Sequence, residues 1–175
     1  MSKAEIQLGR YRSPYARRGQ MVRIAYVIIS AIYWLLTRLA GRPRGIVVLC
    51  YHSVRTDQLQ RFTWQMRHTA RRAVSPSAVA SGRRASGGSP YICVTFDDGF
   101  ENVLKNALPA MQALGVPATL FVVPGSFGTV PAWGMPAGHP DRAERVPSGS
   151  ELAAAARRGL CSIGSHTFSH VRLSQ

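Results

Sequence analysis

The chain has 175 residues, of which 46% are hydrophobic, so it has room for one ordinary domain and a tail, and its composition excludes disorder throughout. Its formal net charge of +14 favours anionic partners such as nucleic acid, acidic lipid or acidic polymer, although a solvated surface rich in arginine has the same composition. Cys50, Cys93 and Cys161 have no C-x-x-C spacing, which excludes a zinc knuckle and a disulfide framework. Each lies in or beside an apolar run, so we expect all three to be small buried side chains.

An apolar segment, residues 21–41, follows a basic arm, and we predict a helix there. The stretch without charges, between Arg23 and Arg38, is shorter than the roughly 20 residues that cross a bilayer, but both arginines could snorkel and extend a span. Positive charge ahead of such a segment is typical of a signal anchor whose N-terminus stays inside. The alternative is an ordinary buried or interfacial helix. We expect residues 1–44 to hold the arm, the apolar helix as a possible membrane anchor, and a linker. Membrane association, with residues 45–175 on the extracytoplasmic side, follows from this interpretation.

Residues 45–175 alternate strand-like and helix-like segments. The expected strands are the apolar runs 46–50, 91–96, 118–123 and 161–164, and the first two are typical of strands buried on both faces. The expected helices are 62–72, 101–114 and 151–158. Pro109 should kink the second helix, and Ser150 can cap the third. Segments 75–90 and 124–149 are predicted as loops. This alternation predicts parallel βαβ units, whose functional groups collect at the carboxyl ends of the strands.

Two polar clusters follow expected strands. Asp97 and Asp98 come directly after the second strand, and because successive strand residues point to opposite sides, the two carboxylates should have different partners and roles. His166 and His170 follow the fourth strand. Taken separately, Asp98 with the next glycine is typical of a tight turn, and the histidines could be unrelated loop residues. Together, one carboxylate and two histidines make a ligand set that leaves coordination positions open, as a catalytic metal requires.

Two motifs carry a resemblance to a known family. Residues 95–99 (TFDDG) and 165–170 (SHTFSH) resemble the first two signature motifs of polysaccharide deacetylases, and the flanking LCYHSV and LPAMQALGVPATLFV agree with that family. The resemblance covers residues 45–175. It implies an incomplete, distorted (β/α) barrel, preceded in this chain by the apolar helix. The family's later motifs, with an orienting arginine and an acid histidine, have no counterpart here, so we expect the N-terminal part of a deacetylase domain, cut short.

The resemblance also implies a reaction and the residues that perform it. Asp98, His166 and His170 would hold a divalent metal, usually zinc, and Asp97 would be the general base that takes a proton from the attacking water. The implied reaction is hydrolysis of N-acetyl groups on the amino sugars of a polysaccharide, which breaks a non-peptide C–N bond. The partner is therefore a polysaccharide with N-acetylated amino sugars.

Two other functions stay open at this point. One is a catalytically inactive, membrane-associated remnant that binds polysaccharide, which the missing later motifs favour. The other is a basic nucleic-acid-binding protein, but the chain has no helix-turn-helix, zinc-finger or RNA-recognition signature, so no nucleic-acid partner is expected. No residue is assigned to substrate binding. Tyr51 and His52 match a frequent first-strand pattern of the family without an assigned role, and His139 is interpreted as a solvated loop residue rather than a substitute acid.

Overall fold

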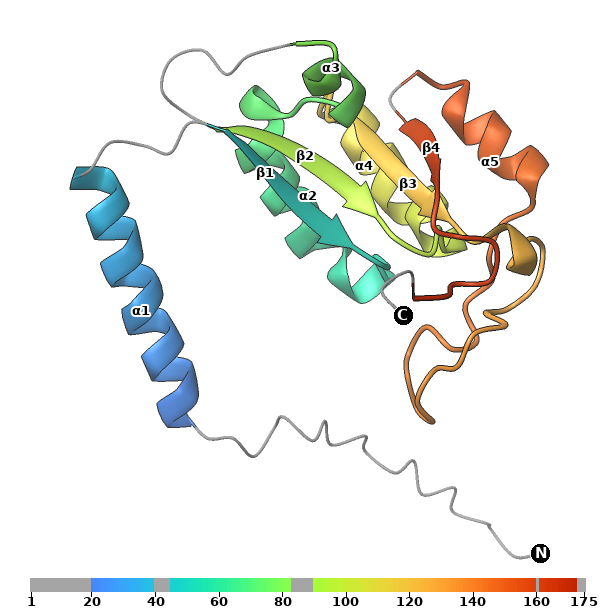
Figure 1. Ribbon diagram of the computed structural model, residues 1–175, viewed down its shortest axis with the longest axis horizontal. Helices are drawn as coiled ribbons and strands as arrows, with labels where there is room; N and C mark the ends of the chain where they lie inside the picture. Colours follow the sequence, from blue (N-terminus) through green and yellow to red (C-terminus); the bar gives the residue numbers. More distant parts are fainter. Residues whose placement is uncertain (1–19, 40–44, 83–89, 160, 173–175) are drawn as a thin grey trace, which may run out of the picture. The chain divides into compact units, whose positions relative to one another are not determined.

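The computed structural model of the chain describes residues 20–39, 45–82, 90–159 and 161–172. The chain divides into two compact units, Met1–Arg42 and Pro43–Gln175. The described part of the first unit is helix α1, Gln20–Leu39 (Figure 1), and its apolar side chains are exposed, with Tyr26 at 67% and Trp34 at 57%. Among the helices that the structure describes, none has the length and apolar character needed to cross a membrane. The predicted basic arm, the linker and the side chains of Arg23 and Arg38 lie outside the described residues.

The second unit is built on a parallel sheet of four strands in the order β1-β2-β3-β4 (Figure 1). The strands are β1 Ile46–Tyr51, β2 Tyr91–Phe96, β3 Ala118–Val122 and β4 Cys161–Ser165. Each neighbouring pair is parallel, so all four carboxyl ends lie at one edge of the sheet. The prediction of a parallel α/β fold is confirmed. The sheet is open, because the described strands leave β1 and β4 as edges and close no barrel.

Helices connect these strands. They are α2 Leu59–Thr69, α3 Pro76–Ala80, α4 Leu108–Ala113 and α5 Gly149–Ala156, with 3-10 turns at Thr56–Gln58, Ala70–Arg72 and Pro124–Ser126. The predicted kink at Pro109 takes the form of a π-helical turn, Val103–Ala107, directly before α4. Proline has no N–H and its ring clashes with the carbonyl four residues earlier, and a widened turn relieves that clash. Ser150 was the expected cap of α5, but Ser148 caps it, in a capping box with Glu151.

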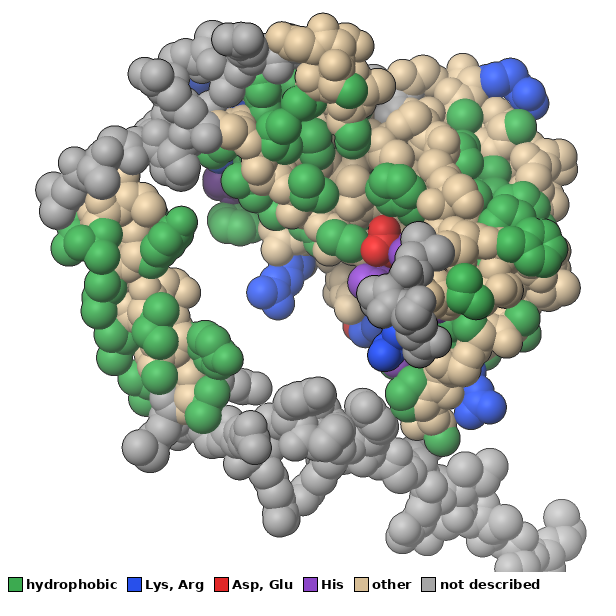
Figure 2. Space-filling view, in the orientation of Figure 1, with side chains coloured by type: hydrophobic (Ala, Val, Ile, Leu, Met, Phe, Trp, Pro, Cys, Tyr) green, Lys and Arg blue, Asp and Glu red, His purple; other side chains and the backbone are tan. Residues whose placement is uncertain are grey.

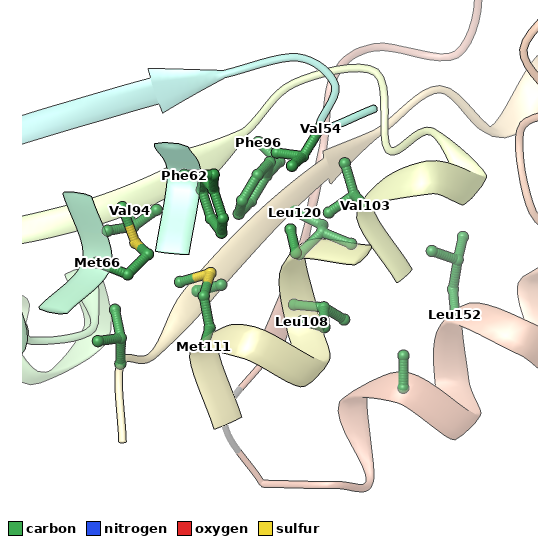
Figure 3. Close-up of a cluster of buried hydrophobic side chains, with 14 of the residues drawn as sticks. Val54, Phe62, Met66, Val94, Phe96, Val103, Leu108, Met111, Leu120 and Leu152 are labelled. Carbon is green, nitrogen blue, oxygen red and sulfur yellow. The ribbon is translucent and has the colours of Figure 1, made fainter. Parts of the chain in front are cut away.

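The core lies between the sheet and the helices that cover it (Figure 3). Phe62 and Met66 of α2 meet Val94 and Phe96 of β2, and Met111 of α4 joins them from the other side of the same cluster. All five side chains are at most 3% exposed. The rings of Phe62 and Phe96 lie 6.0 Å apart. This packing holds β2 in place up to its last residue, directly before the two aspartates.

The prediction that the first strand is buried on both faces is wrong. In β1, Ile46 is 47% exposed and Val48 is 56% exposed. The strand pairs only with β2, so its other edge has no neighbour among the described residues. Leu49 and Tyr51 alone pack against the core from this strand. Its apolar composition is that of a central strand, but its place in the described sheet is an edge.

Candidate metal centre

The turn after β2 presents Asp98. Its backbone φ is 67°, and Gly99 follows with φ 70° and donates its N–H to the carbonyl of Asp97 at 2.8 Å. A side chain at position 99 would place its Cβ 2.7 Å from Cγ1 of Val122, so the turn packs tightly against the end of β3. Glycine is required at position 99, because a residue with a Cβ would be strained by the positive φ and would also clash with Val122. The turn buries Asp98, which is 3% exposed.

The segment after β4 brings two histidines to the same place. His166 donates its N–H to the carbonyl of Val122 at 2.8 Å, which continues the pairing of β4 with β3. Thr167 and His170 then have φ of 65° and 59°. Together with Asp98 they are the non-glycine residues with positive φ in the described part of the chain. Such backbone strain persists where packing holds it, and it concentrates at functional sites.

Asp98, His166 and His170 each offer a ligand atom, and these atoms lie within 4.8 Å of one another. Oδ1 of Asp98 is 3.3 Å from Nε2 of His170 and 3.8 Å from Nε2 of His166. This oxygen is buried and has no hydrogen-bond partner among the described residues. Figure 2 shows acidic (red) and histidine (purple) side chains next to one another on the surface in view. The trio that sequence reasoning selected is therefore brought together.

The electrostatics of the trio suit a cation. Burial raises the pKa of the Asp98 carboxyl, while the nearby His170, His52 and His166 act against that rise. A buried carboxylate is costly to ionise unless positive charge lies beside it. One carboxylate oxygen and two imidazole nitrogens, with room left over, form a ligand set that fits Zn²⁺ and other divalent transition metals. The donor set and the unpartnered Oδ1 thus both fit a metal ion.

Asp97 is not part of the trio. Its N–H donates to the carbonyl of Tyr51 at 2.9 Å, and its Oδ2 accepts a hydrogen bond from the thiol of Cys50 at 3.3 Å. The two adjacent carboxylates thus have different partners. The prediction that all three cysteines are buried is wrong for Cys50, which is exposed near the end of β1, whereas Cys93 is buried and Cys161 is half-buried. The sulfur of Cys50 is nevertheless partly desolvated, and this desolvation, followed by the hydrogen bond to Asp97 and the charge of Asp97, raises the pKa of the Cys50 thiol.

A cavity of about 430 Å³ opens beside the trio. His52, Asp98 and His170 line one part of it, and the segment 124–149 supplies Trp133, His139 and Asp141. Trp133 stacks on the imidazole of His170, with ring centroids 4.9 Å apart and planes 18° from parallel. His139, interpreted from the sequence as a solvated loop residue, is a half-buried loop residue that lines this cavity and accepts a hydrogen bond from the N–H of Asp141. Trp133 and Asp141 were missed by sequence reasoning, since no periodic pattern marks them.

Comparison with known proteins agrees with this geometry. The polysaccharide deacetylase family matches residues 84–175. IcaB from Ammonifex degensii is a similar solved structure, with 27% identity and a TM-score of 0.58 over 72% of this chain and 54% of that one. A de-N-acetylase from Aggregatibacter actinomycetemcomitans shares the fold at 21% identity, with a TM-score of 0.52 over 72% of this chain and 55% of that one.

A polysaccharide deacetylase from Bacillus cereus also shares the fold, at 24% identity and a TM-score of 0.53, over 74% of this chain and 40% of that one. No curated protein sequence matches the chain. The chain spans about half the length of the first two solved relatives. The family match covers more than half of the chain and contains Asp97, Asp98, His166 and His170. The chain belongs to the polysaccharide deacetylase family.

Proposed function

We propose that this chain carries the metal-holding part of an enzyme that hydrolyses N-acetyl groups on the amino sugars of a polysaccharide. The observation that carries the proposal is the trio of Asp98, His166 and His170, whose ligand atoms lie within 4.8 Å of one another beside a cavity. Carbohydrate deacetylation is the activity of the family in general. The metal dependence, the substrate and the activity of this chain are parts of the proposal.

Asp98, His166 and His170 would hold the metal, for which zinc is our choice from the family resemblance. When bound, such a metal polarises a substrate carbonyl and lowers the pKa of water. The side chains of the trio are prepared for this role before any metal binds. Trp133 restricts the ring of His170 by stacking, and the paired ends of β3 and β4 fix the backbone of His166.

In our proposal Asp97 is the general base, and it accepts a proton from the water that attacks the acetamide carbonyl. The Cys50 thiol at 3.3 Å and the backbone bond to Tyr51 hold the carboxylate in one orientation. The C–N bond then breaks, the acetyl carbon keeps the oxygen of water as acetate, and the nitrogen leaves as an amine with a proton from water. A cavity of about 430 Å³ has the size of a site for a small ligand or for part of a sugar chain.

We also propose that the four strands correspond to part of a (β/α) barrel. The parallel order β1-β2-β3-β4, with the polar residues at the carboxyl ends, supports this, as do the two open edges of the described sheet. In barrels of this kind the catalytic groups come from the ends of several strands. Asp97 and Asp98 follow β2, and the two histidines follow β4, in agreement with that rule.

Membrane association of the first unit, with the catalytic part extracytoplasmic, is a separate part of the proposal. The support is α1, where Tyr26, Val27, Ile29, Tyr33 and Trp34 are all more than half exposed in a chain of net charge +14. Apolar and aromatic side chains of this kind enter the lipid interface. Flotation of the chain with anionic vesicles, lost in Ile29→Asp, is the expected result. No flotation of the unaltered chain would contradict this part.

The activity is tested by acetate release from an oligomer of N-acetylglucosamine, with zinc present, by the full chain and by Asp97→Asn. Removing a general base typically lowers the rate by about 10²- to 10⁴-fold. Asp57→Asn is the control, because the Asp57 side chain is 69% exposed. Acetate release by Asp97→Asn at the rate of the unaltered chain would contradict this mechanism. Binding of the oligomer by the unaltered chain without release would favour the alternative, a polysaccharide-binding remnant without activity.

A further inference from the structure

A second carboxylate faces the cavity from the segment 124–149. Asp141 is 6% exposed, and its Oδ2 accepts a hydrogen bond from the hydroxyl of Ser53 at 2.9 Å. Its Oδ1 is buried and has no hydrogen-bond partner among the described residues. Buried polar atoms are nearly always hydrogen-bonded, and leaving a charged one without a partner is costly. Asp141 is therefore a cavity-lining residue with one carboxylate oxygen that has no donor among the described residues.

The backbone around Asp141 holds it in this position. The N–H of Glu144 donates to the carbonyl of Asp141 at 3.1 Å, and Oε1 of Glu144 accepts the N–H of Asn102 at 3.0 Å. The segment is thereby tied to the turn of helix that follows Asp98. On the other side, Ser53 connects Asp141 to the end of β1. The carboxylate is therefore fixed relative to the trio and does not depend on a freely moving loop.

His139 adds a donor beside this acceptor. Its Nδ1 accepts the N–H of Asp141 at 3.2 Å, so the neutral ring carries its proton on Nε2. His139 and Asp141 thus bring one N–H donor and one carboxylate acceptor to the wall of the same cavity. A hydroxyl group uses both at once, because it donates one hydrogen bond and accepts others.

A second metal site is a weaker explanation of these residues. Among the described residues, the only group of three or more possible metal ligands close enough together is Asp98, His166 and His170. Lysine and arginine are absent from the described lining of the cavity, so an internal ion pair does not explain Asp141 either. A neutral ligand rich in hydroxyl groups satisfies both polar atoms without adding charge.

We propose that Asp141 and His139 form a subsite that binds a hydroxyl group of the sugar whose acetamide lies at Asp98, His166 and His170. The inference rests on the proposed function and adds to it the contact that selects the sugar. The subsite positions the substrate and takes no part in the bond changes. The subsite lies in the wall of the cavity that also contains Asp98 and His170.

The test measures binding of N-acetylglucosamine trimer to the zinc-loaded chain by calorimetry, beside trimers that lack one hydroxyl at a time. We expect one deoxy trimer to bind the unaltered chain about tenfold or more weakly, as loss of a hydrogen bond to a charged group implies. Asp141→Asn should bind the complete trimer more weakly by a similar factor, and it should bind the complete trimer and the deoxy trimer equally. Zinc affinity should stay unchanged in this variant.

Three results would overturn the subsite. One is equal binding of all deoxy trimers by the unaltered chain, and another is the same discrimination in Asp141→Asn as in the unaltered chain. If Asp141→Asn does not fold, His139→Gln replaces it, and discrimination that survives in this variant is the third. If the unaltered chain binds zinc but no trimer, the proposed substrate class fails as well, and this result is distinct from failure of the subsite alone.

Discussion

Strands β1 and β2 are similar in composition and differ in their surroundings. Val48 of β1 pairs with Cys93 of β2, yet Val48 is 56% exposed and Cys93 is 2% exposed. Both strands are short runs of apolar and β-branched residues. β2 has a strand on each side and α2 and α4 over one face, whereas β1 has one neighbouring strand among the described residues (Figure 1). The difference teaches that composition predicts a strand, while its neighbours decide how deeply it is buried.

The same contrast separates two carboxylates that are adjacent in the chain. Asp98 is buried against β3 and faces two histidines, whereas Asp97 is partly exposed and accepts a bond from Cys50. Two neighbouring residues thus acquire different roles from the elements that they meet.

The largest expected effect is in thiol labelling. In the native chain at pH 8, a maleimide should modify Cys50 roughly a thousandfold or more faster than Cys93, because Cys93 reacts only when the sheet opens. Peptide mapping by mass spectrometry measures both rates. Asp97→Asn is a further test, since losing the charge that helps to raise the pKa of the Cys50 thiol should speed its labelling. Equal rates at the two cysteines would show that β1 is as covered as β2.

Next in size is a pair of valine truncations. Val94→Ala in β2 should lower the free energy of unfolding by about 2 kcal/mol, because Val94 is fully buried and its loss leaves a cavity. Val48→Ala in β1 should change it by less than about 0.5 kcal/mol. Urea unfolding followed by circular dichroism measures both. Similar losses in the two variants would mean that β1 is covered in solution.

Much of this fold could be predicted from the sequence because the signals are local. The second, third and fourth strands, and the stripe of apolar residues that includes Val103, Leu108 and Met111, follow directly from periodicity. The residues of the trio could be selected because they follow strands, and parallel strands end at one edge.

Other features depend on contacts that no local pattern records. The exposure of β1 depends on which strand lies beside it, and the contact of Cys50 with Asp97 depends on the register of β1 against β2. Asp141 and Trp133 line the cavity because backbone hydrogen bonds position the long segment 124–149, which has no periodic sequence pattern. Sequence reasoning therefore found the proposed ligands and missed the wall around them.

Two serines repeat the comparison on a helix, with a smaller effect. Ser148→Ala should lower the free energy of unfolding by about 1 kcal/mol, because the Ser148 hydroxyl accepts a hydrogen bond from the N–H of Glu151 and caps α5. Ser150→Ala should be nearly neutral, since Ser150 already lies inside the helix. Thermal unfolding of both variants checks this. A larger loss of stability in Ser150→Ala than in Ser148→Ala would mean that Ser150 caps the helix, as the sequence suggested.

The smallest effect concerns pH. Hydrogen bonds from Arg145, then from Ser148, lower the pKa of Glu151 to about 2, from 4.5. A carboxyl whose folded pKa is depressed adds stability that is present above pH 4.5 and is lost as the pH falls through 2. The effect is small because the group is exposed. Glu151→Gln should flatten the dependence of the melting temperature on pH in this window, and an unchanged slope would contradict the role of the pair.

The central claim is that Asp98 and the two histidines form one metal site. We would titrate zinc into the full chain by calorimetry beside Asp98→Asn, which keeps the shape of the side chain and removes its charge, and beside Asp57→Asn as a surface control. The account predicts saturable binding of about one zinc ion by the unaltered chain and the control, weakened at least tenfold in Asp98→Asn. Equal affinity in all three proteins, or no binding by the unaltered chain, would contradict it.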